Sequence, residues 1–103
     1  MHAKDILGII VNSNRYFDFV ANLAEAAADH DKVVHIHLLG DGCEFASTEA
    51  CARLRRQARI TMCAKSACQV AKGVVEGVQG DIPLVPPQEL TRLLKQCCRY
   101  VVF

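Results

Sequence analysis

The chain has 103 residues, of which 51% are hydrophobic and 22% are charged, and its formal net charge is +1. These values predict one soluble domain spanning 1–103, with no global electrostatic attraction to nucleic acid or to a membrane surface. The apolar run at 6–11 is too short for a signal peptide, and no apolar stretch approaches the roughly 20 residues of a membrane span. We therefore expect a cytoplasmic protein, in which the six cysteines are reduced, catalytic or metal-binding rather than a disulfide framework.

The first third of the chain predicts a strand, a helix and a second strand. A nearly continuous apolar sequence within 5–11 is typical of a strand buried on both faces, as in a parallel sheet. Apolar residues then recur at helical spacing through 15–29. The next apolar run, 33–39, alternates in a way that places His35 and His37 on one face of a strand.

The middle of the chain repeats this order. A Gly-Asp-Gly sequence ends the second strand, and Ser47 is expected to cap a helix over 48–57. A short apolar run predicts the third strand at 60–63, and a further helix is expected from 67 to about 76. Several arginines crowd the end of the 48–57 helix, and a solvated helix face explains them more simply than nucleic-acid binding does.

The last third predicts a short strand at 82–85, a helix and a closing strand at 99–103. Two consecutive prolines mark the start of the helix, since proline suits the first helical position. The buried stripe of this helix repeats at i, i+3, i+4 and i+7 and consists of Leu90, Leu93, Leu94 and Cys97. Alternating strands and helices predict an α/β fold, a mostly parallel sheet of four or five strands with helices on both faces.

The segment 60–73, ITMCAKSACQVAKG, contains the candidate site. Cys63 stands where the third strand ends, and Cys68 falls in the first turn of the next helix, behind a capping box that begins at Ser66. A thiol beside the unpaired N–H groups of a helix start, with two lysines in the same segment, ionises more readily than an isolated one. The alternative is that both cysteines are small apolar residues that pack at the ends of elements.

A third cysteine is expected near these two. Ligands and chemistry gather beyond the carboxyl ends of parallel strands, and Cys43 follows the second strand there. We therefore include Cys43 with Cys63 and Cys68 as candidate catalytic residues. Cys51 and Cys97 are expected to pack in the interior, and Cys98 is expected at the turn before the last strand.

Taken together, four segments resemble the DsrE/TusD-like sulfur-relay family. These are ILGIIVNSN, LLGDGCEFA (in which Cys43 replaces an aliphatic residue), ITMCAKSACQVAKG and LLKQCCRYVVF. The resemblance covers nearly the whole chain and implies a DsrE-like fold with flavodoxin-like layering. It also implies a cysteine after the third strand that carries sulfane sulfur as a persulfide. Cys63 occupies that strand-end position, and Cys68 matches a second family cysteine by its distance to Lys72-Gly73, although the spacing between them is longer than in the family.

The same resemblance implies a sulfurtransferase-like activity that needs no cofactor. Its partners would be sulfur donor and acceptor proteins, and family members are commonly trimers or hexamers, homomeric or mixed with related subunits. A non-catalytic subunit, in which the fold serves only for assembly, remains the first alternative.

Metal binding is the second alternative. The zinc-type ligands of the chain include Cys43, Cys63, Cys68, His35 and His37. Their spacing contains no C-x-x-C pair, and the two histidines lie in the middle of a strand, where a polar patch under a helix or at a subunit interface is the simpler interpretation.

Overall fold

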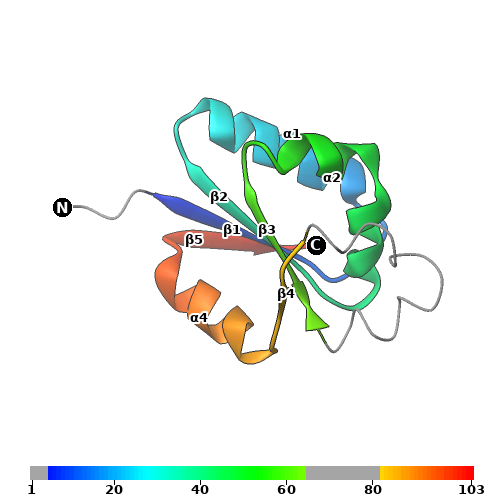
Figure 1. Cartoon of the computed structure of the whole chain (residues 1–103). Helices are drawn as coiled ribbons and strands as arrows, with labels where there is room; N and C mark the ends of the chain where they lie inside the picture. Colours follow the sequence, from blue (N-terminus) through cyan, green and yellow to red (C-terminus); the bar gives the residue numbers. More distant parts are fainter. Residues whose placement is uncertain (1–4, 65–81) are drawn as a thin grey trace.

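The computed structural model describes residues 5–64 and 82–103 of the chain. They form a parallel sheet of five strands in the order β4-β3-β2-β1-β5 (Figure 1). The strands are β1 (Ile6–Val11), β2 (Val33–Leu38), β3 (Arg59–Cys63), β4 (Leu84–Val85) and β5 (Arg99–Val102). The helix expected at 67–76 lies outside the described residues.

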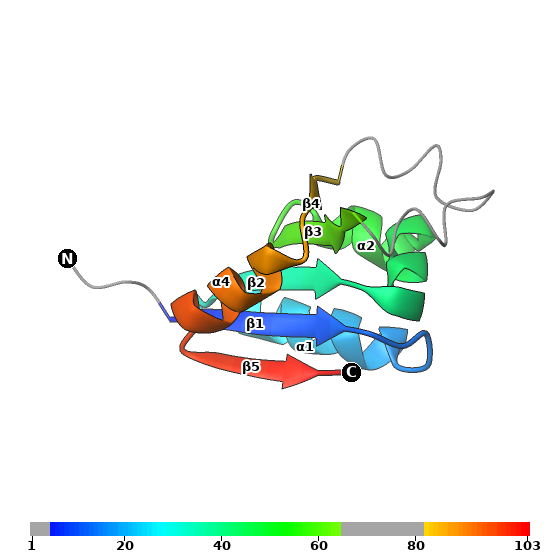
Figure 2. The same cartoon turned by 90° about the horizontal axis from the view of Figure 1, so that it is seen from below.

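Helices cover both faces of the sheet, which confirms the predicted α/β fold. α1 (Phe17–Asp29) and α2 (Glu49–Leu54) lie on one face, and α4 (Gln88–Gln96) lies on the other (Figures 1 and 2). Because α4 carries the chain from β4 back across the sheet to β5, the last strand pairs with β1. β2, β3 and β4 follow one another on one side of β1, whereas β5 lies on its other side. No helix within the described residues is long and apolar enough to cross a membrane.

The two faces of the sheet differ in chemistry. Toward α1 and α2, three isoleucines from adjacent strands stand in register, Ile9 beside Ile36 and Ile36 beside Ile60, each at most 5% exposed. Burying one such side chain stabilises the fold by about 1.5–3 kcal/mol. The opposite face carries His35 and His37 on β2, so a polar row lies inside the central strand on that side.

The segment after β2 is a short 3-10 helix, η1 (Gly40–Ser47), that packs over the carboxyl end of β1. Gly42 is required there, because a Cβ atom on it would lie 1.8 Å from the carbonyl oxygen of Val11. Phe45 is fully buried and its ring meets the ring of Phe17 edge-on, with centroids 5.1 Å apart. Because η1 is anchored in this way, the carboxyl-end edge of the sheet beside β1 is closely packed.

The prediction that Ser47 caps the second helix was wrong by one residue. The N-cap is Thr48, whose Oγ1 accepts a hydrogen bond from the Cys51 N–H at 3.1 Å. The Ser47 hydroxyl instead donates to the Glu44 carbonyl at 2.9 Å and so closes the last turn of η1. The helix was also predicted too long: α2 ends at Leu54, and the chain continues through tight turns to β3.

The predicted apolar stripe of α4 is only partly buried. Leu93 is 3% exposed, whereas the other three positions of the stripe are partly accessible. Cys97 packs closely on β1, because a Cβ atom on Gly8 would lie 3.2 Å from its Sγ. Gly8 therefore lets the end of α4 approach the sheet just before the chain enters β5.

Candidate functional site

The predicted site lies at the carboxyl-end edge of the sheet. Cys63 is the last residue of β3, and Ala64, which follows it, is already helical. Cys43 lies in η1, directly after β2. The two thiols lie close enough for a charge on Cys63 to raise the pKa of Cys43. The other predicted site residue, Cys68, lies outside the described residues.

Cys63 is largely but not completely enclosed, with 7% of its surface exposed. It follows Thr61 by two residues, so strand alternation directs its side chain to the histidine-bearing face of the sheet.

The surroundings of Cys43 oppose a reactive role for this residue, which the sequence predicted as a participant. Its side chain is fully buried in the apolar core. Burial, with smaller contributions from the charges of Cys63 and Asp41, raises the pKa of the Cys43 thiol to about 11. A neutral, enclosed thiol is a poor nucleophile. Cys43 therefore packs in the core as a small apolar side chain.

Polar groups come together on the face of the sheet that α4 covers. The Thr61 hydroxyl lies 3.1 Å from His35 Nε2 and 2.9 Å from His37 Nδ1. A hydroxyl can accept from one imidazole and donate to the other, so one threonine joins both rings. His37 and Thr61 are 2% and 3% exposed, respectively, which makes these hydrogen bonds a buried connection between β2 and β3.

Both histidines are neutral at physiological pH. Burial lowers the pKa of His35 to about 4, with help from the positive charge of Arg59 and from that of His37 once it is protonated. Burial also lowers the pKa of His37, against a smaller opposing effect of the Glu89 carboxylate on α4. The sequence predicted the shared face of the two histidines but missed Thr61. A polar residue inside an otherwise apolar strand was the signal that could have identified it.

The metal-binding alternative requires histidine and cysteine side chains to lie close enough together to coordinate one ion. Within residues 5–64 and 82–103, no group of three or more His, Cys, Asp or Glu side chains could hold a metal ion. The two imidazoles instead share the Thr61 hydroxyl as a hydrogen-bond partner. Their arrangement is that of a structural hydrogen-bond network, which ties neighbouring strands together under a helix.

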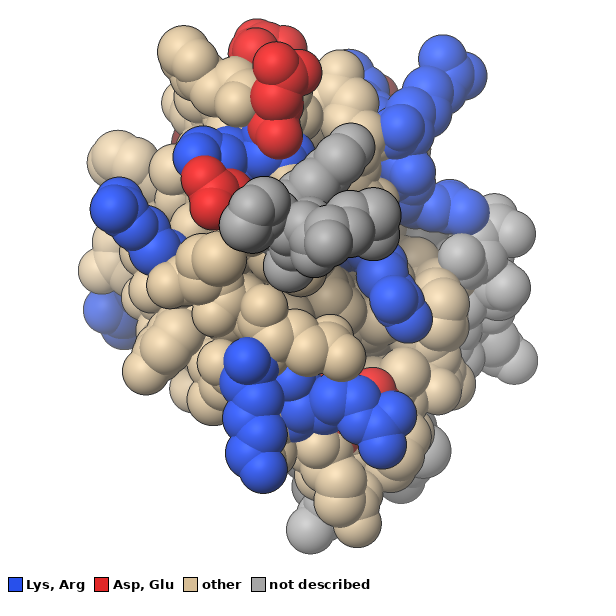
Figure 3. All heavy atoms as spheres, turned by 90° about the vertical axis from the view of Figure 1, so that its left-hand side faces the viewer, with Lys and Arg blue, Asp and Glu red and all other residues tan. Residues whose placement is uncertain are grey.

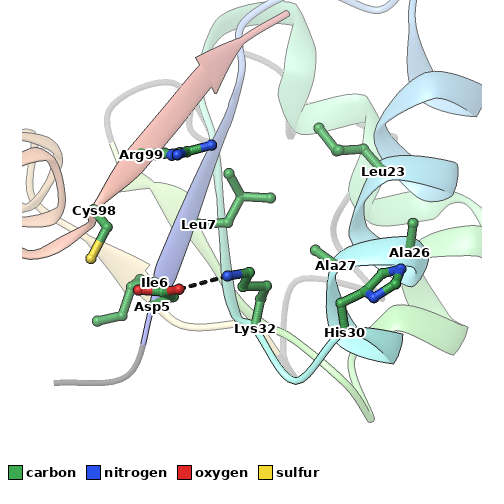
Figure 4. Close-up of a pocket in the computed structure, with 10 residues that line it drawn as sticks. All are labelled: Asp5, Ile6, Leu7, Leu23, Ala26, Ala27, His30, Lys32, Cys98 and Arg99. Atoms are coloured by element: carbon green, nitrogen blue, oxygen red, sulfur yellow. Dashed lines mark hydrogen bonds and ion pairs between the residues drawn. The ribbon is translucent and has the colours of Figure 1, made fainter. Parts of the chain in front are cut away.

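A second candidate site lies at the opposite, amino-end edge of the sheet, where sequence reasoning placed none. A cavity of about 580 Å³ opens between α1 and the starts of β1 and β5 (Figure 4). Its rim carries Asp5, Lys32 and Arg99, and the exposed Cys98 stands at its side. Lys and Arg side chains are spread over this end of the molecule (Figure 3).

Comparison with known proteins identifies a fold but not a family. No protein-family model matches the chain, and no curated protein matches it. A solved structure of a conserved protein of unknown function from Bacteroides thetaiotaomicron is similar, with a TM-score of 0.73 over 96% of this chain and 95% of that one. The two sequences are 15% identical, so the likeness concerns the fold alone.

Proposed function

We propose that the protein relays sulfane sulfur as a cysteine persulfide, with Cys63 as the carrier and Cys68 as the second candidate or the resolving thiol. The observation that carries the proposal is the position of Cys63, at the carboxyl end of β3 and immediately before a helical residue. Parallel sheets place ligands and reacting groups at this edge. The resemblance of the sequence to DsrE-like sulfur carriers points to the same residue.

The transfer itself requires little machinery. A Cys63 thiolate attacks the outer sulfur of a donor persulfide, a new S–S bond forms at Cys63, and the donor leaves as a thiolate. The acceptor repeats the same exchange and returns Cys63 to the thiolate. No carbon bond changes and no net oxidation occurs, so the protein needs to supply only access, orientation and stabilisation of the anion.

The burial of Cys63 would protect a persulfide on it from unwanted exchange with other thiols. A persulfide that is open to solvent exchanges with any thiol that reaches it. With 7% of its surface exposed, Cys63 presents a small window to a partner. The neutral thiol of Cys43 beside it adds no competing nucleophile, since burial raises its pKa to about 11. Donor and acceptor proteins, and a homomeric or mixed oligomer such as a trimer or hexamer, belong to the same proposal.

The test is sulfur loading followed by intact-protein mass spectrometry. Because Cys98 is exposed and would react with any persulfide reagent, the parent protein for the test is Cys98→Ser. Incubation with glutathione persulfide should add one sulfur atom to this parent. Peptide mapping should place the atom on Cys63, and Cys63→Ser in the same background should abolish the gain.

Two further variants separate the possible outcomes. Cys68→Ser distinguishes a resolving thiol, whose loss prolongs the persulfide, from a carrier, whose loss prevents it. Cys51→Ser removes a buried core thiol and serves as a control that should load normally. Loading that persists when both Cys63 and Cys68 are replaced would contradict the assignment.

A non-catalytic assembly subunit is the second candidate function. The observation that favours it is the burial of Cys43 and Cys63 together with the raised pKa of Cys43. A protein with this role would show no sulfur gain on Cys63 or Cys68 and would form a stable complex, which light scattering at micromolar concentration would detect.

A further inference from the structure

The cavity at the amino-end edge has walls that the fold fixes firmly. The backbone N–H of Val33 donates to the Asp5 carbonyl at 3.0 Å, and the N–H of Cys98 donates to the Ile6 carbonyl at 2.9 Å. These hydrogen bonds hold the starts of β2, β1 and β5 side by side. α1 closes the other side of the cavity through Leu23 and Ala27 (Figure 4).

The lining combines an apolar wall with a charged rim. Leu7 from β1 faces Leu23 and Ala27 from α1 across the cavity (Figure 4). Cavities of about 300–1,000 Å³ with mostly apolar walls and a few convergent polar groups are the usual form of small-molecule sites. At about 580 Å³, this one falls within that range.

Two cationic side chains, Lys32 and Arg99, stand at the rim, and of these two only Lys32 forms an ion pair within the described residues. Lys32 forms an ion pair with Asp5 at 2.6 Å. The hydrogen bond and the charge of Lys32 hold the pKa of the Asp5 carboxyl below its usual value, and Cys98 and Arg99 contribute less. Arg99 is exposed and makes no ion pair within residues 5–64 and 82–103. A guanidinium offers a planar pair of donors that matches a carboxylate.

We propose that this cavity binds a small organic anion, a carboxylate joined to an apolar body, with the carboxylate at Arg99 and the apolar part against Leu7, Leu23 and Ala27. The site is separate from the cysteines at the carboxyl-end edge and does not depend on sulfur transfer. The anionic character of the ligand follows from the available guanidinium, and the apolar character follows from the wall.

Octanoate is a suitable probe because it combines one carboxylate with an aliphatic chain, and octanamide is its uncharged match. Calorimetric titration of the full chain should show saturable binding of octanoate and weaker binding of octanamide. Arg99→Gln should weaken octanoate binding by about tenfold or more, the loss expected when a charge-assisted hydrogen bond is removed. Binding should also slow the alkylation of Cys98, which stands at the cavity.

Two variants serve as controls for folding and for general charge. Arg56→Gln removes an exposed arginine outside this cavity and should leave octanoate binding unchanged. Ala26→Leu fills the cavity from an exposed position on α1, where leucine is a good helix former, and should abolish binding without unfolding the protein.

Three results would overturn the proposal. Equal affinity for octanoate and octanamide would show that the negative charge of the ligand does not contribute to binding. Unchanged binding in Arg99→Gln or in Ala26→Leu would place the ligand elsewhere. Sedimentation that shows a dimer for the wild type and a monomer for Ala26→Leu, with no octanoate bound, would assign the surface to self-association instead.

Discussion

The two ends of the parallel sheet are built in opposite ways. At the carboxyl-end edge, η1 presses on β1 so closely that Gly42 leaves no room for a Cβ atom, and Cys43 is fully buried. At the amino-end edge, an open cavity separates α1 from β5, and Cys98 is exposed beside the charged groups of Asp5 and Lys32.

The thiols at the two edges therefore differ in their exposure to solvent and to reagents. Enclosure raises the pKa of Cys43 and restricts access to Cys63. Exposure opens Cys98 to any reagent in solution. A function that needs a protected sulfur atom suits the first edge, whereas the reversible binding of a small molecule suits the second. Four predictions test this contrast.

The largest expected effect is in cysteine alkylation. In the native protein at pH 8, iodoacetamide should modify Cys98 at least about a hundredfold faster than Cys43 or Cys51. Burial raises the pKa of each of these two thiols to about 11, which leaves only about 0.1% as thiolate at that pH. Peptide mass spectrometry over time measures the rates, and denatured protein provides the control. Similar native rates at the three positions would contradict the contrast between the edges.

The next effect is on stability. Gly42→Ala should lower the free energy of unfolding by about 3 kcal/mol, because the new methyl group would overlap the Val11 carbonyl oxygen, 1.8 Å away. Urea denaturation measures the change. Asp5→Asn, at the open edge, removes only an exposed ion pair with Lys32 and should lower the denaturation midpoint far less. An unaltered midpoint in Gly42→Ala would show that η1 is not packed as described.

Acid should destabilise the protein through the histidine-bearing face. His35 has a folded-state pKa of about 4, against an ordinary value of 6.5, so below pH 6.5 the unfolded chain binds a proton that the folded protein does not. Stability should fall as the pH decreases from 6.5 toward 4, by at most about 1.4 kcal/mol per pH unit for this group. The lowered pKa of His37 acts in the same direction.

Urea midpoints at pH 7 and pH 5 measure this effect. His35→Gln should reduce the difference between the two midpoints, whereas His30→Gln, at an exposed position after α1, should keep it. Equal acid sensitivity in the wild type and in His35→Gln would show that the buried network is not its source.

The smallest effect concerns the helix that follows η1. Thr48→Ala should destabilise the protein by about 1 kcal/mol, because Thr48 Oγ1 accepts the Cys51 N–H at the start of α2. Ser47→Ala should cost less, since the exposed Ser47 hydroxyl donates only to the Glu44 carbonyl. Thermal denaturation of both variants compares them, and the reverse order would support the cap expected from the sequence.

Local patterns were sufficient for the strands and for the placement of Cys63. The apolar run of β1 and the alternation of β2 are properties of neighbouring residues, and they predicted both elements closely. The start of α2 was predicted one residue early because η1, whose Phe45 contacts Phe17 far earlier in the sequence, extends to Ser47. The raised pKa of Cys43 likewise comes from burial by distant segments.

The sequence by itself determined the α/β alternation, the parallel sheet and the location of two cysteines at one edge, because hydrophobic periodicity and helix signals act over a few residues. Only the tertiary structure decided that β5 returns beside β1, which brings Asp5, Lys32 and Arg99 to one cavity. It also decided that Thr61 joins both histidines. These arrangements depend on strand order and register, which pair residues that are distant in the chain.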